Sequence, residues 1–250
     1  MLPIIQIMAA TGCYTKRMKR GAVGIHLPDR RLLFSLLVSN ALSVALFFIR
    51  IIGSGTTRFS FLPWNLFLAW LPLLISTWLV WHAGRKGWLN WQGVVGTLLW
   101  LGFLPNSFYM LTDLVHLQSS GEINILFDTV LVVSYIFNGL VVGYLSLYQV
   151  HRALLKRLSA KRAHLTIWAV LLGVGFAIYL GRSLRWNTWD LLLHPSGLLF
   201  DVSDRIVHPV SYPEAFLTTT TFWLLMSAMY YVVWQFLQIA HDPTASKTKQ

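Results

Sequence analysis

The chain has 250 residues, of which 56% are hydrophobic and only 12% are charged, with a formal net charge of +11. A soluble domain cannot bury so much apolar surface, and a disordered chain would be far more polar, so the composition predicts a protein with several membrane spans. Cys13 is the only cysteine, which excludes an intrachain disulfide and a cysteine-based metal site.

Six apolar stretches are each long enough to cross about 30 Å of hydrocarbon as a helix. They are residues 32–52, 61–82, 91–111, 124–148, 165–183 and 214–240. Pro63 and Pro72 are tolerated within a spanning helix when neighbouring groups satisfy the freed carbonyls, and the run Thr218–Thr221 does not forbid a helix. The runs are continuous and not alternating, so we expect an all-helical transmembrane domain over residues 32–240.

Basic residues predict the orientation of these spans. Most Lys and Arg residues lie before the first span, between the second and third, between the fourth and fifth, and in the tail. The positive-inside rule therefore places both termini in the cytoplasm, and most carboxylates fall on the outer side. In a membrane protein this distribution explains the positive charge, so we expect no nucleic-acid partner.

Two segments lie outside the predicted bundle. Residues 1–31 carry a short apolar run followed by a basic cluster, which is the reverse of signal-peptide order. An interfacial segment, a cleaved peptide and a true start at Met18 all fit this pattern. Residues 241–250 are predicted to form a disordered cytoplasmic tail.

Polar residues gather near the outer end of the third span. Asn106, Tyr109, Asp113 and His116 follow one another at intervals of three, four and three residues. These positions lie within about 80° of one another on a helix that continues past the kink expected at Pro105. Ionisable residues in a membrane span are costly, and they are candidates for function for that reason.

The fourth and fifth spans carry matching groups on the same membrane side. Tyr179, Arg182, Trp186 and Trp189 in the fifth span repeat the three-four-three spacing, and Arg185, Asn187 and Asp190 lie beside them. The fourth span begins with Asn124 and Asp128, and Tyr135 and Asn138 continue the Asp128 face. We therefore expect the three groups to converge near the outer interface.

Purely structural roles also fit these residues. Trp186 and Trp189 suit interfacial anchors, and an arginine near a helix end can complement the helix dipole or reach lipid phosphates. Asp113 and Arg182 suit an ion pair that fixes helix packing. We expect at least one of Asp113 and Asp128 to pair with Arg182 or Arg185, because a buried arginine without a carboxylate is very costly.

Three kinds of chemistry are compatible with this cluster. Asp113, His116 and Asp128 are the candidates for acid–base catalysis. Guanidinium groups bind carboxylates and phosphates with two parallel hydrogen bonds, so an anion is the expected ligand of the set Asn106, Tyr109, Arg182, Arg185, Trp186, Asn187 and Asp190. Asp113, His116, Asp128, Asp190 and His194 are possible metal ligands by type, but no recognised metal signature is present, and no metal is expected.

Three segments resemble the DUF1361 family of uncharacterised bacterial integral membrane proteins. They are NLFLAWLP at Asn65–Pro72, FLPNSFYMLTDLVHL at Phe103–Leu117 and GFAIYLGRSLRWNTWDLL at Gly175–Leu192. They occur in the family's order, and the resemblance covers roughly residues 35–240. Ser107 and Phe108 depart from the small residue or proline that usually follows Pro-Asn. The resemblance implies a multispan bacterial inner-membrane protein and transfers no activity or cofactor.

Three function classes remain open. The first is a protein that binds or transports an anionic or amphipathic small molecule through an outward-facing polar site. The second is a membrane enzyme acting on a lipid or envelope precursor, and the third is a scaffold. Residues 184–213 contain too many apolar side chains for a solvated loop, so we expect an interfacial segment or short helix there, folded over the outer ends of the bundle.

Overall fold

The computed structural model describes residues 30–118, 124–186 and 190–240, and this part of the chain is helical. Its long helices are α2 (Arg30–Ser54), α3 (Phe61–Lys86), α4 (Trp91–Tyr109), α5 (Ile125–Leu155), α6 (Ala160–Ser183) and α9 (Pro213–Ala240). With α4 extended to His116 by a short 3₁₀ helix, six segments are long and apolar enough to cross a membrane. The predicted all-helical membrane fold is therefore confirmed. The segment before Arg30 and the tail 241–250 lie outside the described residues.

The observed helices extend beyond the predicted spans mainly where basic residues follow the apolar runs. α3 continues to Lys86, α5 continues to Leu155, and α6 starts at Ala160 instead of residue 165. The basic side chains in the last turns of α3 and α5 interact favourably with the helix dipoles, and at all three ends the long basic side chains can reach the interface, so these helices extend beyond their apolar runs.

The third span changes its geometry where the polar cluster begins. α4 runs through Pro105 to Tyr109, and the 3₁₀ helix η2 (Met110–His116) follows. A 3₁₀ helix has three residues per turn, so side chains three positions apart eclipse one another. The expectation of a continuous α-helical face through His116 is therefore wrong, and Asp113 and His116 are eclipsed.

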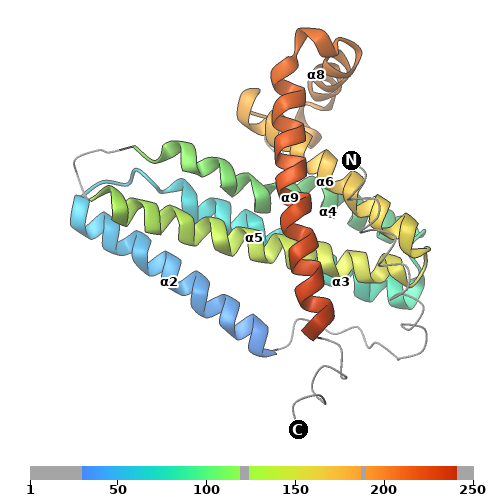
Figure 1. The fold of residues 1–250 in the computed structure, drawn as a ribbon, viewed down its shortest axis with the longest axis horizontal. Helices are drawn as coiled ribbons and strands as arrows, with labels where there is room; N and C mark the ends of the chain where they lie inside the picture. Colours follow the sequence, from blue (N-terminus) through green and yellow to red (C-terminus); the bar gives the residue numbers. More distant parts are fainter. Residues whose placement is uncertain (1–29, 119–123, 187–189, 241–250) are drawn as a thin grey trace.

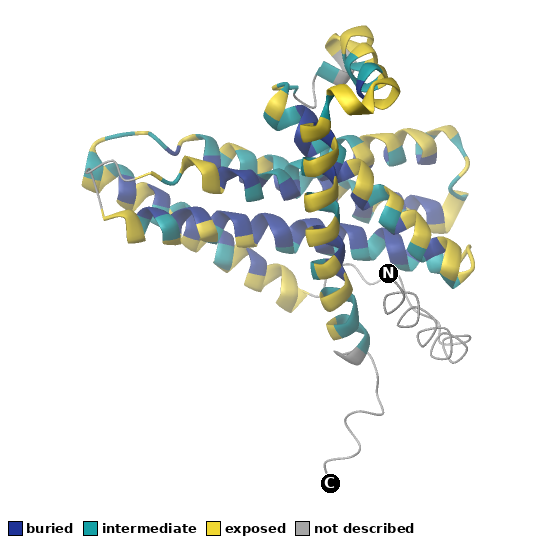
Figure 2. Cartoon of the chain, turned by 45° about the horizontal axis from the view of Figure 1, so that its top comes forward, coloured by how far each residue is buried: buried dark blue, intermediate teal, exposed yellow. Residues whose placement is uncertain are grey.

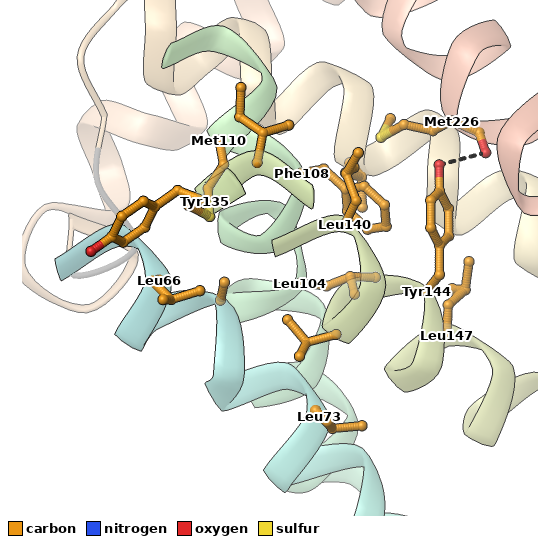
Figure 3. Close-up of a cluster of buried hydrophobic side chains, with 14 of the residues drawn as sticks. Leu66, Leu73, Leu104, Phe108, Met110, Tyr135, Leu140, Tyr144, Leu147 and Met226 are labelled. Atoms are coloured by element: carbon orange, nitrogen blue, oxygen red, sulfur yellow. Dashed lines mark hydrogen bonds between the residues drawn. The ribbon is translucent and has the colours of Figure 1, made fainter. Parts of the chain in front are cut away.

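The helices form two packed groups around one core. α3 packs against both α4 and α5, and α2 packs against α5, whereas α6 and α9 pack mainly against each other. Figure 1 shows α9 crossing α5 at a steep angle. The groups meet where the Tyr144 hydroxyl of α5 donates a hydrogen bond to the Met226 carbonyl of α9 at 3.1 Å (Figure 3). Tyr144 also packs edge-on against Phe108 of α4, so α5 is the central helix.

Burial follows this arrangement. In Figure 2 the buried residues form a continuous band along α5, while exposed residues cover the outer faces of the other helices. Many of these exposed side chains are large and apolar, such as Phe34, Leu98 and Phe236. A water-soluble protein would hide such faces, whereas a bilayer solvates them.

Polar side chains inside the bundle tie helices together. Asn138 of α5 donates to Ser43 of α2 at 2.8 Å and accepts from Asn40 at 3.2 Å. The Asn40 oxygen in turn accepts a hydrogen bond from the Trp70 indole at 3.0 Å. Asn138 therefore serves interhelical packing and does not reach the polar cluster with which the sequence grouped it.

Residues 190–212 form short helices instead of an extended loop. They are α7 (Asp190–Leu193), α8 (Pro195–Val207) and the 3₁₀ helix η3 (Pro209–Ser211). Leu198 and Val202 of α8 pack against Tyr179 at the end of α6 and Ala215 at the start of α9. A short helix is thus present as expected. However, Figure 1 shows it over the ends of α6 and α9, well away from the ends of α2 and α3.

Candidate functional site

One end of the bundle, called the site end below, collects the ionisable residues. α2 and η2 end there, α3 and α5 begin there, and α6 reaches it through Arg182 near its own end. Contacts across this end join Arg50 to Asp128 and Arg182 to His116. The groups predicted on the third, fourth and fifth spans therefore do share one end, although they make two separate clusters.

The first cluster is a buried ion pair between α2 and α5. Arg50 Nε lies 3.1 Å from Asp128 Oδ1, and the side chains are 0% and 2% exposed. The same guanidinium donates to the hydroxyls of Ser54 at 2.9 Å and Thr56 at 2.6 Å, and it stacks over the Phe59 ring. The Arg50 guanidinium and the Asp128 carboxylate neutralise each other, so this cluster stabilises the packing of α2 against α5.

The pairing expected from the sequence is therefore wrong. Asp128 pairs with Arg50, and neither Asp113 nor Asp128 forms an ion pair with Arg182 or Arg185. Arg50 lies near the end of the first predicted span, and the sequence pattern offered no partner for it. A span-by-span search for faces cannot reveal a contact between residues 78 positions apart in the chain.

The second cluster surrounds η2. The Asp113 carboxylate is buried, and its Oδ2 accepts a hydrogen bond from the Asn65 side chain of α3 at 3.2 Å. Arg182 of α6 interacts electrostatically with this carboxylate from beyond ion-pair distance. Its Nη1 lies 3.4 Å from His116 Nε2, which can accept the hydrogen bond in its neutral form. Arg182 therefore borders both eclipsed side chains of η2.

Arg58, from the connection between α2 and α3, contacts the backbone of the same histidine. Its two terminal nitrogens donate to the backbone carbonyls of Gln118 at 3.4 Å and His116 at 3.3 Å. Beside these groups opens a cavity of about 110 Å³, lined by Arg58, Phe59, Phe61, Val115, His116 and Gln118. Arg58, His116 and Arg182 together are called the basic triad below.

The two arginines of the triad carry positive charge, and in the part of the chain that the structure describes neither forms an ion pair with a carboxylate. Among the described residues, Arg58 and Arg182 donate only to backbone carbonyls and to a histidine nitrogen. The Asp113 carboxylate is turned toward Asn65 instead. Since Arg58 and His116 line the open cavity and Arg182 contacts His116, the arrangement suits a bound anion.

Two other predicted ligand residues lie in α4, the helix that leads into η2. The Tyr109 ring lies against Gly181, the residue before Arg182, where an added Cβ would meet the ring at 3.0 Å. Asn106 donates to the Phe103 carbonyl one turn earlier in α4. Tyr109 thus sets how closely α4 and α6 approach at the site end.

The remaining predicted ligand residues do not join the triad. Trp186 donates its indole N–H to Asp201 of α8 at 2.8 Å, and Asp190 lies 3.7 Å from His194 within its own segment. Arg185 is exposed, with a backbone φ of 60°. Asn187 lies outside the described residues. The possible metal ligands of the sequence likewise stay apart, since the described part of the chain has no group of three His, Cys, Asp or Glu side chains.

Polar groups hold α8 in place beside the site end. Asp201 accepts from both Trp186 and Arg205, and the Arg205 guanidinium stacks over the Tyr212 ring. Hydrogen bonds from Tyr212 and His208 lower the pKa of the Asp204 carboxyl, which keeps that group ionised. The hydrogen bond of Trp186 therefore ties α8 to the end of α6, and its expected roles as an interfacial anchor or a ligand residue stay predictions.

The fold and the lipid-suited outer faces define a multi-pass helical membrane protein. A family model described as "Protein of unknown function (DUF1361)" matches residues 64–234, so the chain belongs to this family, as its motifs suggested. No curated protein and no solved structure matches it.

Proposed function

We propose that this protein binds an anionic group at the basic triad, on the outward face of a bacterial inner membrane. The observation that carries the proposal is the pair of arginines at His116, neither of which forms an ion pair with a carboxylate among the described residues, beside an open cavity lined by Arg58 and His116. A phosphate or a carboxylate supplies the oxygen atoms that both guanidinium groups need.

Phosphate binding tests the proposal directly. We expect inorganic phosphate to raise the thermal unfolding temperature of the detergent-purified protein more than chloride of equal ionic strength does. Arg182→Gln should weaken phosphate binding roughly 10- to 100-fold, because a hydrogen bond to a charged group contributes about 1.5–3 kcal/mol. Arg182→Lys should also weaken it, since an ammonium cannot reproduce the guanidinium fork.

Arg85 offers a matched control, because it stacks over Trp81 at the opposite end of the bundle. Arg85→Gln removes the same charge and should leave phosphate binding unchanged. An equal loss in the Arg85 and Arg182 variants would show non-specific attraction to a basic protein and would contradict the proposed site.

The orientation has its own test. Ser196 lies in α8, which packs over the end of α6 that carries Arg182, and Leu158 follows α5 at the opposite end of the bundle, where Arg152, Lys156, Arg157, Lys161 and Arg162 gather. In a Cys13→Ser background, we expect Ser196→Cys to react with a membrane-impermeant maleimide in intact cells and Leu158→Cys to react only after lysis. Labelling of Leu158→Cys alone in intact cells would place the triad on the cytoplasmic side.

A further inference from the structure

The cavity beside the triad is polar on one side and apolar on the other. Arg58, His116 and the Gln118 backbone carry its polar groups, whereas Phe59, Phe61 and Val115 line the rest. The Phe61 ring packs against the His116 ring with centroids 5.1 Å apart. A small water-soluble anion needs only the polar half of such a surface.

An exposed apolar side chain, Val115, lines this cavity, and the exposed Leu114 precedes it in η2. Val115 is 62% exposed and Leu114 is 45% exposed, and both lie in the last turns of the third candidate span. At this depth the hydrocarbon of a bilayer gives way to head groups, and a basic head-group site next to exposed valine and leucine fits an amphiphile that stays in the membrane.

We infer that the anion at the triad is the head group of a membrane-embedded amphiphile, whose apolar part lies against Phe61, Leu114 and Val115. This inference rests on the proposed anion site and adds the class of ligand. The cavity of about 110 Å³ holds a single phosphate or carboxylate, so the rest of the ligand extends along the exposed side chains of η2. The shared chemistry is one anionic group joined to a hydrocarbon chain.

Three probes with matched parts separate head group from tail. Glycerol 3-phosphate carries the head group alone, dioctanoylglycerol carries the tails alone, and dioctanoyl phosphatidic acid carries both. The rise in the thermal unfolding temperature in a non-ionic detergent measures how strongly each probe stabilises the protein. We expect phosphatidic acid to stabilise the protein at concentrations at least about tenfold lower than glycerol 3-phosphate, since about two buried methylenes correspond to tenfold in affinity. Dioctanoylglycerol should have no effect. A parallel comparison of octanoate with acetate tests a carboxylate head group in the same way, and it distinguishes a fatty acid from a phospholipid as the ligand.

Two variants assign the parts of the ligand to parts of the site. Val115→Ser should remove the advantage of phosphatidic acid and leave glycerol 3-phosphate binding unchanged, while Arg182→Gln should weaken both. Val210→Ser is the matched control, because Val210 is 92% exposed and lies in η3, away from the triad.

The outcomes are distinguishable. The amphiphile inference would be overturned if phosphatidic acid bound no better than glycerol 3-phosphate, octanoate bound no better than acetate, and Val115→Ser changed neither comparison. The proposed anion site would then remain intact. Stabilisation by dioctanoylglycerol equal to that by phosphatidic acid would also overturn it, because the head group would then contribute nothing. Failure of Arg182→Gln to weaken any probe would instead overturn the proposed function.

Discussion

Arg50→Met is expected to lower the free energy of unfolding by about 3–5 kcal/mol, because it leaves the Asp128 carboxylate buried without a cation. Asp128 is 2% exposed, and Arg50 Nε is the cationic group in contact with it, at 3.1 Å. Asp128→Asn should also lower the free energy of unfolding, because it leaves the Arg50 guanidinium buried without a carboxylate. Ser54 and Thr56 continue to accept hydrogen bonds from Arg50 in this variant. Equilibrium unfolding of the purified protein in mixed detergent measures both changes.

A double variant separates the ion pair from the loss of each side chain. Replacing a buried pair with apolar residues of similar volume is often neutral or stabilising, so Arg50→Met with Asp128→Leu should recover much of the stability. Arg58→Met is the matched single control, because Arg58 is partly exposed and donates only to backbone carbonyls. Additive losses in the double variant would show that the two residues are not coupled.

The membrane fold was predictable because its signal is local. Continuous apolar runs of about twenty residues have few alternatives to a spanning helix, so the long helices fall where the sequence places them. The ends were less predictable, since α3 and α5 continue past their apolar runs into basic residues such as Lys86 and Arg152. Hydropathy reports where the chain meets hydrocarbon, and a helix held by backbone hydrogen bonds does not stop there.

The candidate site was predictable only in part, because its geometry depends on contacts between helices. The sequence indicated that Asp113, His116 and Arg182 share one end, and the structure brings these three together. It did not indicate Arg58 or Asn65, whose roles arise from the way α3 packs beside η2. Arg58 lies in the short connection between the first two predicted spans, where its charge alone does not indicate which neighbour it contacts.

Trp186 is a residue whose predicted neighbours differ from those in the structure. Its spacing from Tyr179 and Arg182 suggested one shared helical face, but α6 ends at Ser183, so the spacing no longer applies. The indole then finds Asp201 on α8, an acceptor 15 residues later in the chain. Helical periodicity predicts a shared face only as far as the helix itself extends.

The glycines of α6 give the second large effect. We expect Gly175→Val to destabilise the protein by at least about 1–3 kcal/mol, because a Cβ there would lie 2.7 Å from the Thr219 carbonyl oxygen of α9. That oxygen belongs to the backbone and cannot move aside as a flexible side chain would. The substitution must therefore push α9 away from α6, as expected for a glycine that lets two spanning helices approach closely.

Gly173, two residues earlier in the same helix, is the matched control. A Cβ at Gly173 would meet nothing within 4 Å, so Gly173→Val introduces the same side chain into open space. The two substitutions share any change in helix propensity. The difference between their losses in free energy of unfolding therefore reports the contact between α6 and α9 alone. Unfolding in mixed detergent should therefore show a large loss for Gly175→Val and little or none for Gly173→Val. Equal losses would mean that the close approach of α6 to α9 contributes nothing, and the small residue at 175 would need another explanation.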